Sequence, residues 1–138
     1  MCGLQNIGNT CYMAAGLQCL SNIPVFRDYF ISGRFANDIN RDNPLGWKGE
    51  VAEEYASLMR SLWSDRCHSS LRPAGFKRML GRLNPQFDGY AQQDCQEFLA
   101  FLMDGLHEDL NRVKVGIVCM QYHTYAQPRV IHVDNAAS

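Results

Sequence analysis

The sequence lacks an excess of charge of either sign, a long apolar run and a paired-cysteine motif. Its 13 Lys and Arg residues nearly balance its 14 Asp and Glu residues, for a formal net charge of -1. Nucleic-acid-binding proteins concentrate positive charge, so no nucleic-acid partner is expected. No apolar stretch approaches the ~20 residues that cross a bilayer, and no signal-peptide pattern precedes the first motif. We therefore expect a soluble, unsecreted chain with no membrane partner.

The cysteines also lack the spacing of a zinc site or of a compact disulfide framework. Six cysteines and four histidines are scattered along the chain without a C-x-x-C pair. Neither a metal site nor a bound cofactor is therefore expected. Irregularly spaced cysteines in an unsecreted chain favour reduced thiols, which predicts localisation in the cytoplasm or the nucleus.

Helical periodicity dominates what the sequence does contain. The 46% hydrophobic and 20% charged composition suits one globular domain. Apolar spacing, with Thr10 as an expected N-cap and prolines as stops, predicts a mainly α fold. Helices are expected from 11 to about 22, over 25–32, from about 50 to 63, over 73–83 and from 92 to 112. The last has the longest apolar stripe and is predicted to be the central core helix, whereas residues 35–48 should form a surface loop tethered by Leu45 and Trp47.

The composition changes after Val113. The remaining residues are rich in valine, isoleucine and tyrosine and have no helical period. This pattern predicts either one or two short strands or a poorly ordered tail. We expect the helical domain to occupy residues 1–113 and leave residues 114–138 unassigned.

Cys11 stands at the start of the first predicted helix, behind a turn that contains Gly8. Free N–H groups at a helix N-terminus favour a thiolate, which is the reactive form of a thiol. The same groups can stabilise the oxyanion formed when a carbonyl is attacked, and Asn6 can add a side-chain amide donor. Alternatively, Cys11 is structural, because a small, half-apolar side chain fits a helix start as well as serine or alanine does.

Two motifs resemble a known family. The stretch "GLQNIGNTCYM" at Gly3–Met13 is similar to the cysteine box of the ubiquitin-specific proteases, and "QQDCQEFL" at Gln92–Leu99 resembles their glutamine-and-acid box. The segments "DNPLGWKGE" and "FLMDGLHEDLNR" also resemble connecting segments of one branch of the family. The resemblance covers Gly3 to about Arg112, and two dense motifs in the right order are more specific than either alone.

The resemblance implies the helical thumb subdomain of a papain-like cysteine protease. Members of the family are deubiquitinases, thiol proteases that hydrolyse isopeptide or peptide bonds after the C-terminal glycine of ubiquitin. Ubiquitin or ubiquitinated proteins are thus the implied partners. Position by position, the resemblance makes Cys11 the nucleophile and Asn6 the oxyanion-hole donor.

Four further residues match family positions near the substrate. Asp94 and Glu97 correspond to acidic positions that contact the basic tail of ubiquitin, and two carboxylates three residues apart on a helix can hold an arginine. They can equally favour the dipole of the helix they begin, with no ligand. Gln92 and Gln93 are expected close to the scissile bond, with helix capping or solvation as the alternative.

The sequence departs from the family at the general base. The family supplies a histidine from a Gly-His-Tyr segment far downstream, and no such segment occurs here. His123 and His132 are the late candidates, but neither follows a glycine. We therefore expect a thumb with palm and fingers missing, inactive in isolation. Ala14, where the family usually has asparagine, is a second departure.

A non-catalytic role is the alternative function. A helical module can bind ubiquitin or another partner through the Asp94 and Glu97 face and the hydrophobic surface exposed by the missing palm, without hydrolysing anything. This apolar surface is also expected to promote self-association of the isolated chain.

Overall fold

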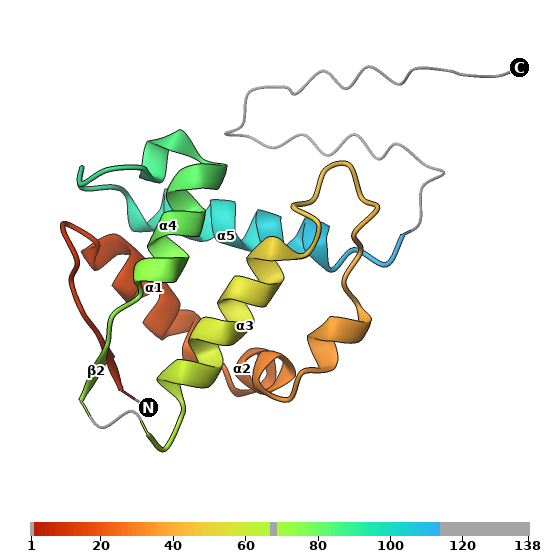
Figure 1. Ribbon diagram of the computed structural model, residues 1–138, viewed down its shortest axis with the longest axis horizontal. Coiled ribbons are helices and arrows are strands. Elements are labelled where there is room, and N and C mark those ends of the chain that lie inside the picture. The colour runs from red at the N-terminus through yellow and green to blue at the C-terminus, as the bar shows by residue number, and fades with distance from the viewer. Residues whose placement is uncertain (1, 67–68, 114–138) are drawn as a thin grey trace, which may run out of the picture.

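The computed structural model describes residues 2–66 and 69–113 (Figure 1). Within this part the chain is mainly helical, as predicted, and the predicted tail, residues 114–138, lies outside it. The α-helices are α1 (Cys11–Ser21), α2 (Pro24–Ile31), α3 (Glu50–Leu62), α4 (Ala74–Leu83) and α5 (Cys95–Asp109). The shorter elements are β1 (Gly3–Leu4), β2 (Ser70–Leu71) and the 3-10 turns η1 (Arg34–Asn37) and η2 (Pro85–Phe87). None of the described helices is long and apolar enough to span a membrane.

The helix ends follow local chemistry. Pro24 occupies the first turn of α2, where a missing N–H costs no hydrogen bond, and thereby separates α1 from α2. The start predicted for the fifth helix is wrong by three residues, because Asp94 caps α5. Its Oδ1 accepts a hydrogen bond from the Glu97 N–H at 2.9 Å, so Gln92 and Gln93 remain in the preceding loop.

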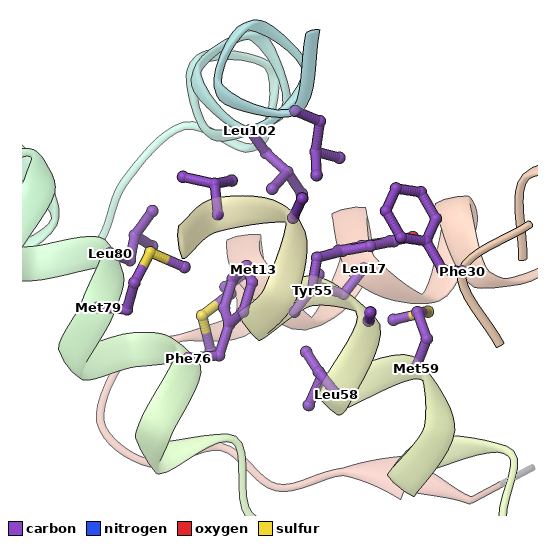
Figure 2. Close-up of a cluster of buried hydrophobic side chains, with 14 of the residues drawn as sticks. Met13, Leu17, Phe30, Tyr55, Leu58, Met59, Phe76, Met79, Leu80 and Leu102 are labelled. Carbon is purple, nitrogen blue, oxygen red and sulfur yellow. The ribbon is translucent and has the colours of Figure 1, made fainter. Parts of the chain in front are cut away.

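The prediction that the fifth helix is the centre of the core is also wrong. The central helix is α3, which contacts α2, α4 and α5, and Figure 1 shows it crossing between them. Small Ala52 and Ala56 allow close neighbours on more than one side of α3, while fully buried Tyr55 and Met59 fill the space between helices. The core seen in Figure 2 therefore draws side chains from all five helices.

A two-stranded parallel sheet, which the sequence did not predict, positions the N-terminal segment. Gly3 pairs with Ser70 and Leu4 with Leu71. The Gln5 N–H continues the ladder to the Leu71 carbonyl at 2.9 Å. Strands of two residues are too short to show an alternating pattern. Their effect is to fix the chain immediately before the turn that leads to Cys11.

The described cysteines differ in redox state. Cys11, Cys19 and Cys95 are free thiols, as the spacing predicted. Cys2 is disulfide-bonded, which contradicts the prediction that the cysteines are reduced. The Cys2 side chain is buried next to the end of α3, and its N–H donates to the Leu62 carbonyl at 3.0 Å.

The loop between α2 and α3 is tethered differently from the prediction. Trp47 packs partly buried against the core, but Leu45 is 47% exposed and does not anchor the loop. The anchor is instead the carboxylate of Asp109, which lies fully buried at the end of α5 and accepts a hydrogen bond from the Trp47 N–H. A buried acid is unusual enough that apolar patterning alone does not reveal it.

Candidate active site

The turn before α1 is organised around the side chain of Asn6. Its Oδ1 accepts hydrogen bonds from Gly8 N at 3.1 Å, Thr10 N at 3.2 Å and Thr10 Oγ1 at 3.3 Å. Three converging donors identify this atom as the amide oxygen, so the Nδ2 group faces the opposite way. Asn6 is exposed, and within residues 2–66 and 69–113 no acceptor engages Nδ2. An unoccupied donor with a fixed orientation thus stands beside the first helix.

The first turn of α1 is left without a side-chain cap. Thr10 occupies the N-cap position, but its hydroxyl makes no capping hydrogen bond, contrary to the role that its residue type suggested. The hydroxyl turns back into the loop, where it bonds Asn6 and accepts from the Ile7 N–H at 3.1 Å. The first-turn N–H groups therefore remain available to an incoming acceptor, next to the exposed thiol of Cys11.

The two sequence motifs meet at Cys11. The Nε2 of Gln92 lies 3.9 Å from the Cys11 Sγ and donates to it. Tyr12, the next residue, is buried with its ring edge-to-face against Phe98 of α5, at 5.8 Å between centroids. The helices approach closely here because Gly16 of α1 has no side chain: a Cβ would lie 3.0 Å from the Phe98 ring.

A contact between loops, not predicted from the sequence, holds Gln92 in place. The Nδ2 of Asn9 donates to the Tyr90 carbonyl at 2.8 Å. The Tyr90 ring lies over Gly8, whose φ of 117° and lack of a Cβ permit the approach. Tyr90 is 74% exposed, an unusual position for an aromatic ring. Gly8 in the first motif and Tyr90, two residues before the second motif, were the only signals of this pairing.

Asp94 and Glu97 both lie at the start of α5, but their side chains form different hydrogen bonds. Asp94 caps the helix through its Oδ1. Glu97 accepts a hydrogen bond from Gln86 Nε2, and the same amide donates to Gln93 Oε1 at 3.4 Å. Both carboxylates are exposed, and neither forms an ion pair with a described residue. Helix capping and an open anionic surface are therefore combined in one place.

The other free thiols are less suited to nucleophilic attack. Burial is the main reason that the pKa of Cys95 is raised, with the negative charges of Cys19 and Asp94 adding to it. A raised pKa keeps Cys95 in its unreactive thiol form. Cys19 is exposed on α1, but it lies eight residues beyond the helix start and outside the reach of its N-terminal dipole.

No imidazole of the described residues serves Cys11. Of the four histidines, His107 alone falls in the described ranges, where it lies on α5 twelve residues after Cys95. That separation is roughly 18 Å along a helix axis. His123 and His132 lie outside the described residues. Among the residues described, no group of His, Cys, Asp and Glu is arranged to hold a metal ion.

Comparisons with known proteins agree with the motifs. The protein-family model described as "Ubiquitin carboxyl-terminal hydrolase" matches residues 2–134, and so extends past Arg112, where the motif resemblance ends. The chain is 54% identical over 114 residues to ubiquitin carboxyl-terminal hydrolase 15 of Xenopus tropicalis. It is 59% identical over 114 residues to ubiquitin carboxyl-terminal hydrolase 4 of Bos taurus. Each alignment covers 83% of this chain but only 12% of the relative.

Proposed function

Because this chain belongs to the ubiquitin carboxyl-terminal hydrolase family, we propose that it supplies the nucleophile and the oxyanion donors of a thiol protease. The proposed substrates are proteins joined to the C-terminal glycine of ubiquitin by an isopeptide or peptide bond. One observation carries the proposal: exposed Cys11 begins an uncapped helix, and Thr10, the residue before it, holds the Asn6 amide through Oδ1 so that Nδ2 is free.

The proposed reaction proceeds through an acyl-enzyme. The Cys11 thiolate attacks the glycine carbonyl, and the electron pair moves to the carbonyl oxygen. Asn6 Nδ2 and the N–H groups of α1 stabilise this oxyanion. Collapse of the intermediate breaks the C–N bond, the amine leaves with a proton, and a thioester remains. Water then attacks the thioester, releasing the ubiquitin carboxylate and the thiol.

We expect the 138-residue chain to have little or no activity alone. Proton transfer to the leaving amine requires a general acid, and the described residues provide no imidazole near Cys11. The printed sequence also has no Gly-His-Tyr segment. A complete enzyme therefore needs a histidine positioned against Cys11 by other parts of the protein.

The start of α5 is the proposed binding surface for the tail of ubiquitin. Asp94 and Glu97 are exposed and have no basic partner among the described residues. Paired carboxylates bind the guanidinium groups of a basic tail. Gln92 and Gln93 directly precede this surface, and Gln92 connects it to Cys11 through its contact with the Sγ atom. The same observation supports the second candidate function, a non-catalytic module that binds the ubiquitin tail.

Labelling with a ubiquitin that carries a C-terminal electrophile separates the two candidates. The probe should be offered to the full-length protein and to the 138-residue chain, with adducts mapped by mass spectrometry. The protease hypothesis expects labelling at Cys11 in the full-length protein, none in Cys11→Ala, and normal labelling in Cys19→Ala. Binding of ubiquitin with no adduct supports the non-catalytic module. Equal labelling of Cys11 and Cys19 would contradict the catalytic assignment.

Two further properties complete the proposal. Self-association is supported by two neighbouring apolar side chains at the start of α2, Ile23 and Val25, which are 48% and 81% exposed. Sedimentation at increasing concentration tests it, and a monomer at all concentrations contradicts it. Residence in the cytoplasm or nucleus is supported by the free thiols of Cys11, Cys19 and Cys95, while the disulfide at Cys2 counts against it. Fractionation of cells expressing the tagged protein tests it.

A further inference from the structure

Thr10 departs from the usual behaviour of a threonine before a helix. It is fully buried and stands at the N-cap of α1, yet its hydroxyl does not bond the first turn of that helix. An N-cap hydroxyl ordinarily accepts from a first-turn N–H and stabilises the helix. Helix α1 lacks this stabilisation, so the orientation of the Thr10 hydroxyl needs another explanation.

The hydroxyl bonds two groups of the preceding turn, accepting from one and donating to the other. Its oxygen accepts from the Ile7 N–H at 3.1 Å, and its single proton points to the Asn6 Oδ1 at 3.3 Å. The N–H groups of Gly8 and Thr10 reach the same oxygen. A flipped amide would place the Asn6 NH₂ group against these donors, where it could accept none of them. The donors therefore hold Oδ1 toward the turn and leave Nδ2 pointing away from it, free to donate.

We propose that Thr10 is a positioning residue, whose hydroxyl orients the Asn6 amide so that Nδ2 meets the oxyanion formed at Cys11. This role rests on the proposed protease function. It assigns to Thr10 an effect on the rate of the chemical step rather than on substrate binding, because Thr10 is buried and reaches the substrate only through Asn6. It also explains why α1 starts without a cap: a hydroxyl that capped α1 would not hold the amide, and the first-turn N–H groups would be occupied.

Two substitutions that share one loss test the role of the hydroxyl. Thr10→Ser and Thr10→Ala both remove the methyl group, and only Thr10→Ala removes the hydroxyl. In the full-length protein, with a ubiquitin amide that releases a fluorophore, Thr10→Ala should lower kcat about tenfold. KM should stay within about twofold, since the substitution removes no contact with the bound substrate. Thr10→Ser should keep kcat within about twofold of the wild type.

Two further measurements distinguish positioning from a general structural role. Alkylation of Cys11 by iodoacetamide forms no oxyanion, so its rate should be unchanged in Thr10→Ala. In an Asn6→Ala background, Thr10→Ala should lower kcat no further, because the amide that it orients is gone. A fall in alkylation that matches the fall in kcat, or an additive loss in the double variant, would overturn the proposal.

The remaining outcomes are equally decisive. Full kcat in Thr10→Ala, or equal losses in Thr10→Ala and Thr10→Ser, overturns the role of the hydroxyl while leaving the protease function intact. A wild-type protein that neither hydrolyses the amide nor is labelled at Cys11 overturns both. Thermal unfolding of each variant shows whether it folds. If Thr10→Ala does not fold, Thr10→Val, which keeps the shape of threonine and loses only the hydroxyl, is compared directly with the wild type, alone and in the Asn6→Ala background, with the same expected losses.

Discussion

Asn6 and Asp109 are two side-chain acceptors of similar shape in opposite surroundings. Each gathers three hydrogen bonds from neighbouring groups. Asp109 is fully buried and accepts from the N–H groups of Trp47 at 2.6 Å, Val51 at 2.9 Å and Ala52 at 3.3 Å. Asn6 is exposed and accepts three donors with one atom, Oδ1. The carboxylate has no donor of its own, whereas the amide keeps one unused.

The difference separates a structural hydrogen-bond network from one that the proposed mechanism uses. Every bond to the Asp109 carboxylate joins the end of α5 to the loop and helix that precede it by about sixty residues, so this side chain stabilises the fold. The bonds to Asn6 stay within five residues and stabilise little beyond the turn. In the proposed mechanism they orient a donor toward the oxyanion of the substrate.

Removing the carboxylate of Asp109 should cost the most. Asp109→Ala leaves the buried N–H groups of Val51 and Ala52 without this acceptor and releases the loop at Trp47, which should lower the free energy of unfolding by about 3–5 kcal/mol. Asp109→Asn keeps one acceptor oxygen and should cost less. Urea denaturation followed by circular dichroism measures both. Exposed Asp42, in the same loop, provides the control: Asp42→Asn should stay within about 0.5 kcal/mol of wild type. Equal losses at the two positions would contradict the anchoring role.

Asn6→Asp is the complementary change. It retains an oxygen for the donors of Gly8 and Thr10 but replaces the outward-facing N–H with a second oxygen. The free energy of unfolding should therefore change by less than about 1 kcal/mol. Hydrolysis by the full-length protein should fall at least about a hundredfold, because a donor to the oxyanion becomes a negative charge. An Asn6→Asp protein that loses stability but keeps activity would mean that Asn6 serves the fold, as Asp109 does, rather than catalysis.

The helices could be predicted from the sequence because their signals are local. Apolar side chains recur every three or four residues in α1 through α5, and Pro24 and Pro85 mark boundaries that the structure confirms. The boundaries of α5 are the exception: the helix begins three residues after the predicted start, because Asp94 caps it, and ends three residues before the predicted end, at Asp109.

The hydrogen bonds of the site could be predicted only in part. The motif points to Cys11 and Asn6 as candidates, whereas the direction of the Thr10 hydroxyl depends on the backbone geometry of the whole turn. Asp109 was hidden for another reason: its partners lie near residue 50, and no pattern in α5 distinguishes a buried acid from an exposed one. The partners of Asp109 could not be predicted because they lie far from it in the sequence, although the hydrogen bonds themselves are of an ordinary kind.

A pair of glycines tests how firmly the loop that carries Gln92 is attached to the turn. Gly8→Ala combines a strained φ of 117° with a Cβ only 2.5 Å from the Tyr90 ring, so it should cost about 2–3 kcal/mol. Gly89→Ala shares the strain, with a φ of 74°, but its Cβ meets nothing within 4 Å, and it should cost about 1 kcal/mol. Urea denaturation gives both values. Indistinguishable costs would mean that Tyr90 moves aside freely.

Asp38 provides the smallest expected effect and lies between the two extremes. Its side chain is partly buried, more than that of Asn6 and less than that of Asp109, and like Asp109 it serves structure. Arg112 donates to its Oδ1 at 2.7 Å and Tyr29 to its Oδ2 at 2.6 Å. The hydrogen bond from Arg112, followed by that from Tyr29, lowers the pKa of Asp38. The same carboxylate, together with burial as the larger cause, raises the pKa of Tyr29 to about 12.

The sign of the pH dependence follows from the lowered pKa of Asp38. A carboxyl group whose pKa is depressed by folding stabilises the native state above its ordinary pKa, and that contribution disappears as the pH falls through the folded value. Wild type should therefore exceed Asp38→Asn in stability near pH 7, and the gap should narrow toward about pH 3. Because Arg112 is the first cause, Arg112→Gln should remove most of this narrowing. Urea denaturation of wild type, Asp38→Asn, Arg112→Gln and the double variant between pH 7 and about pH 3 measures the difference in stability. A difference that persists in acid would show that the shape of the side chain, rather than its charge, explains the contact.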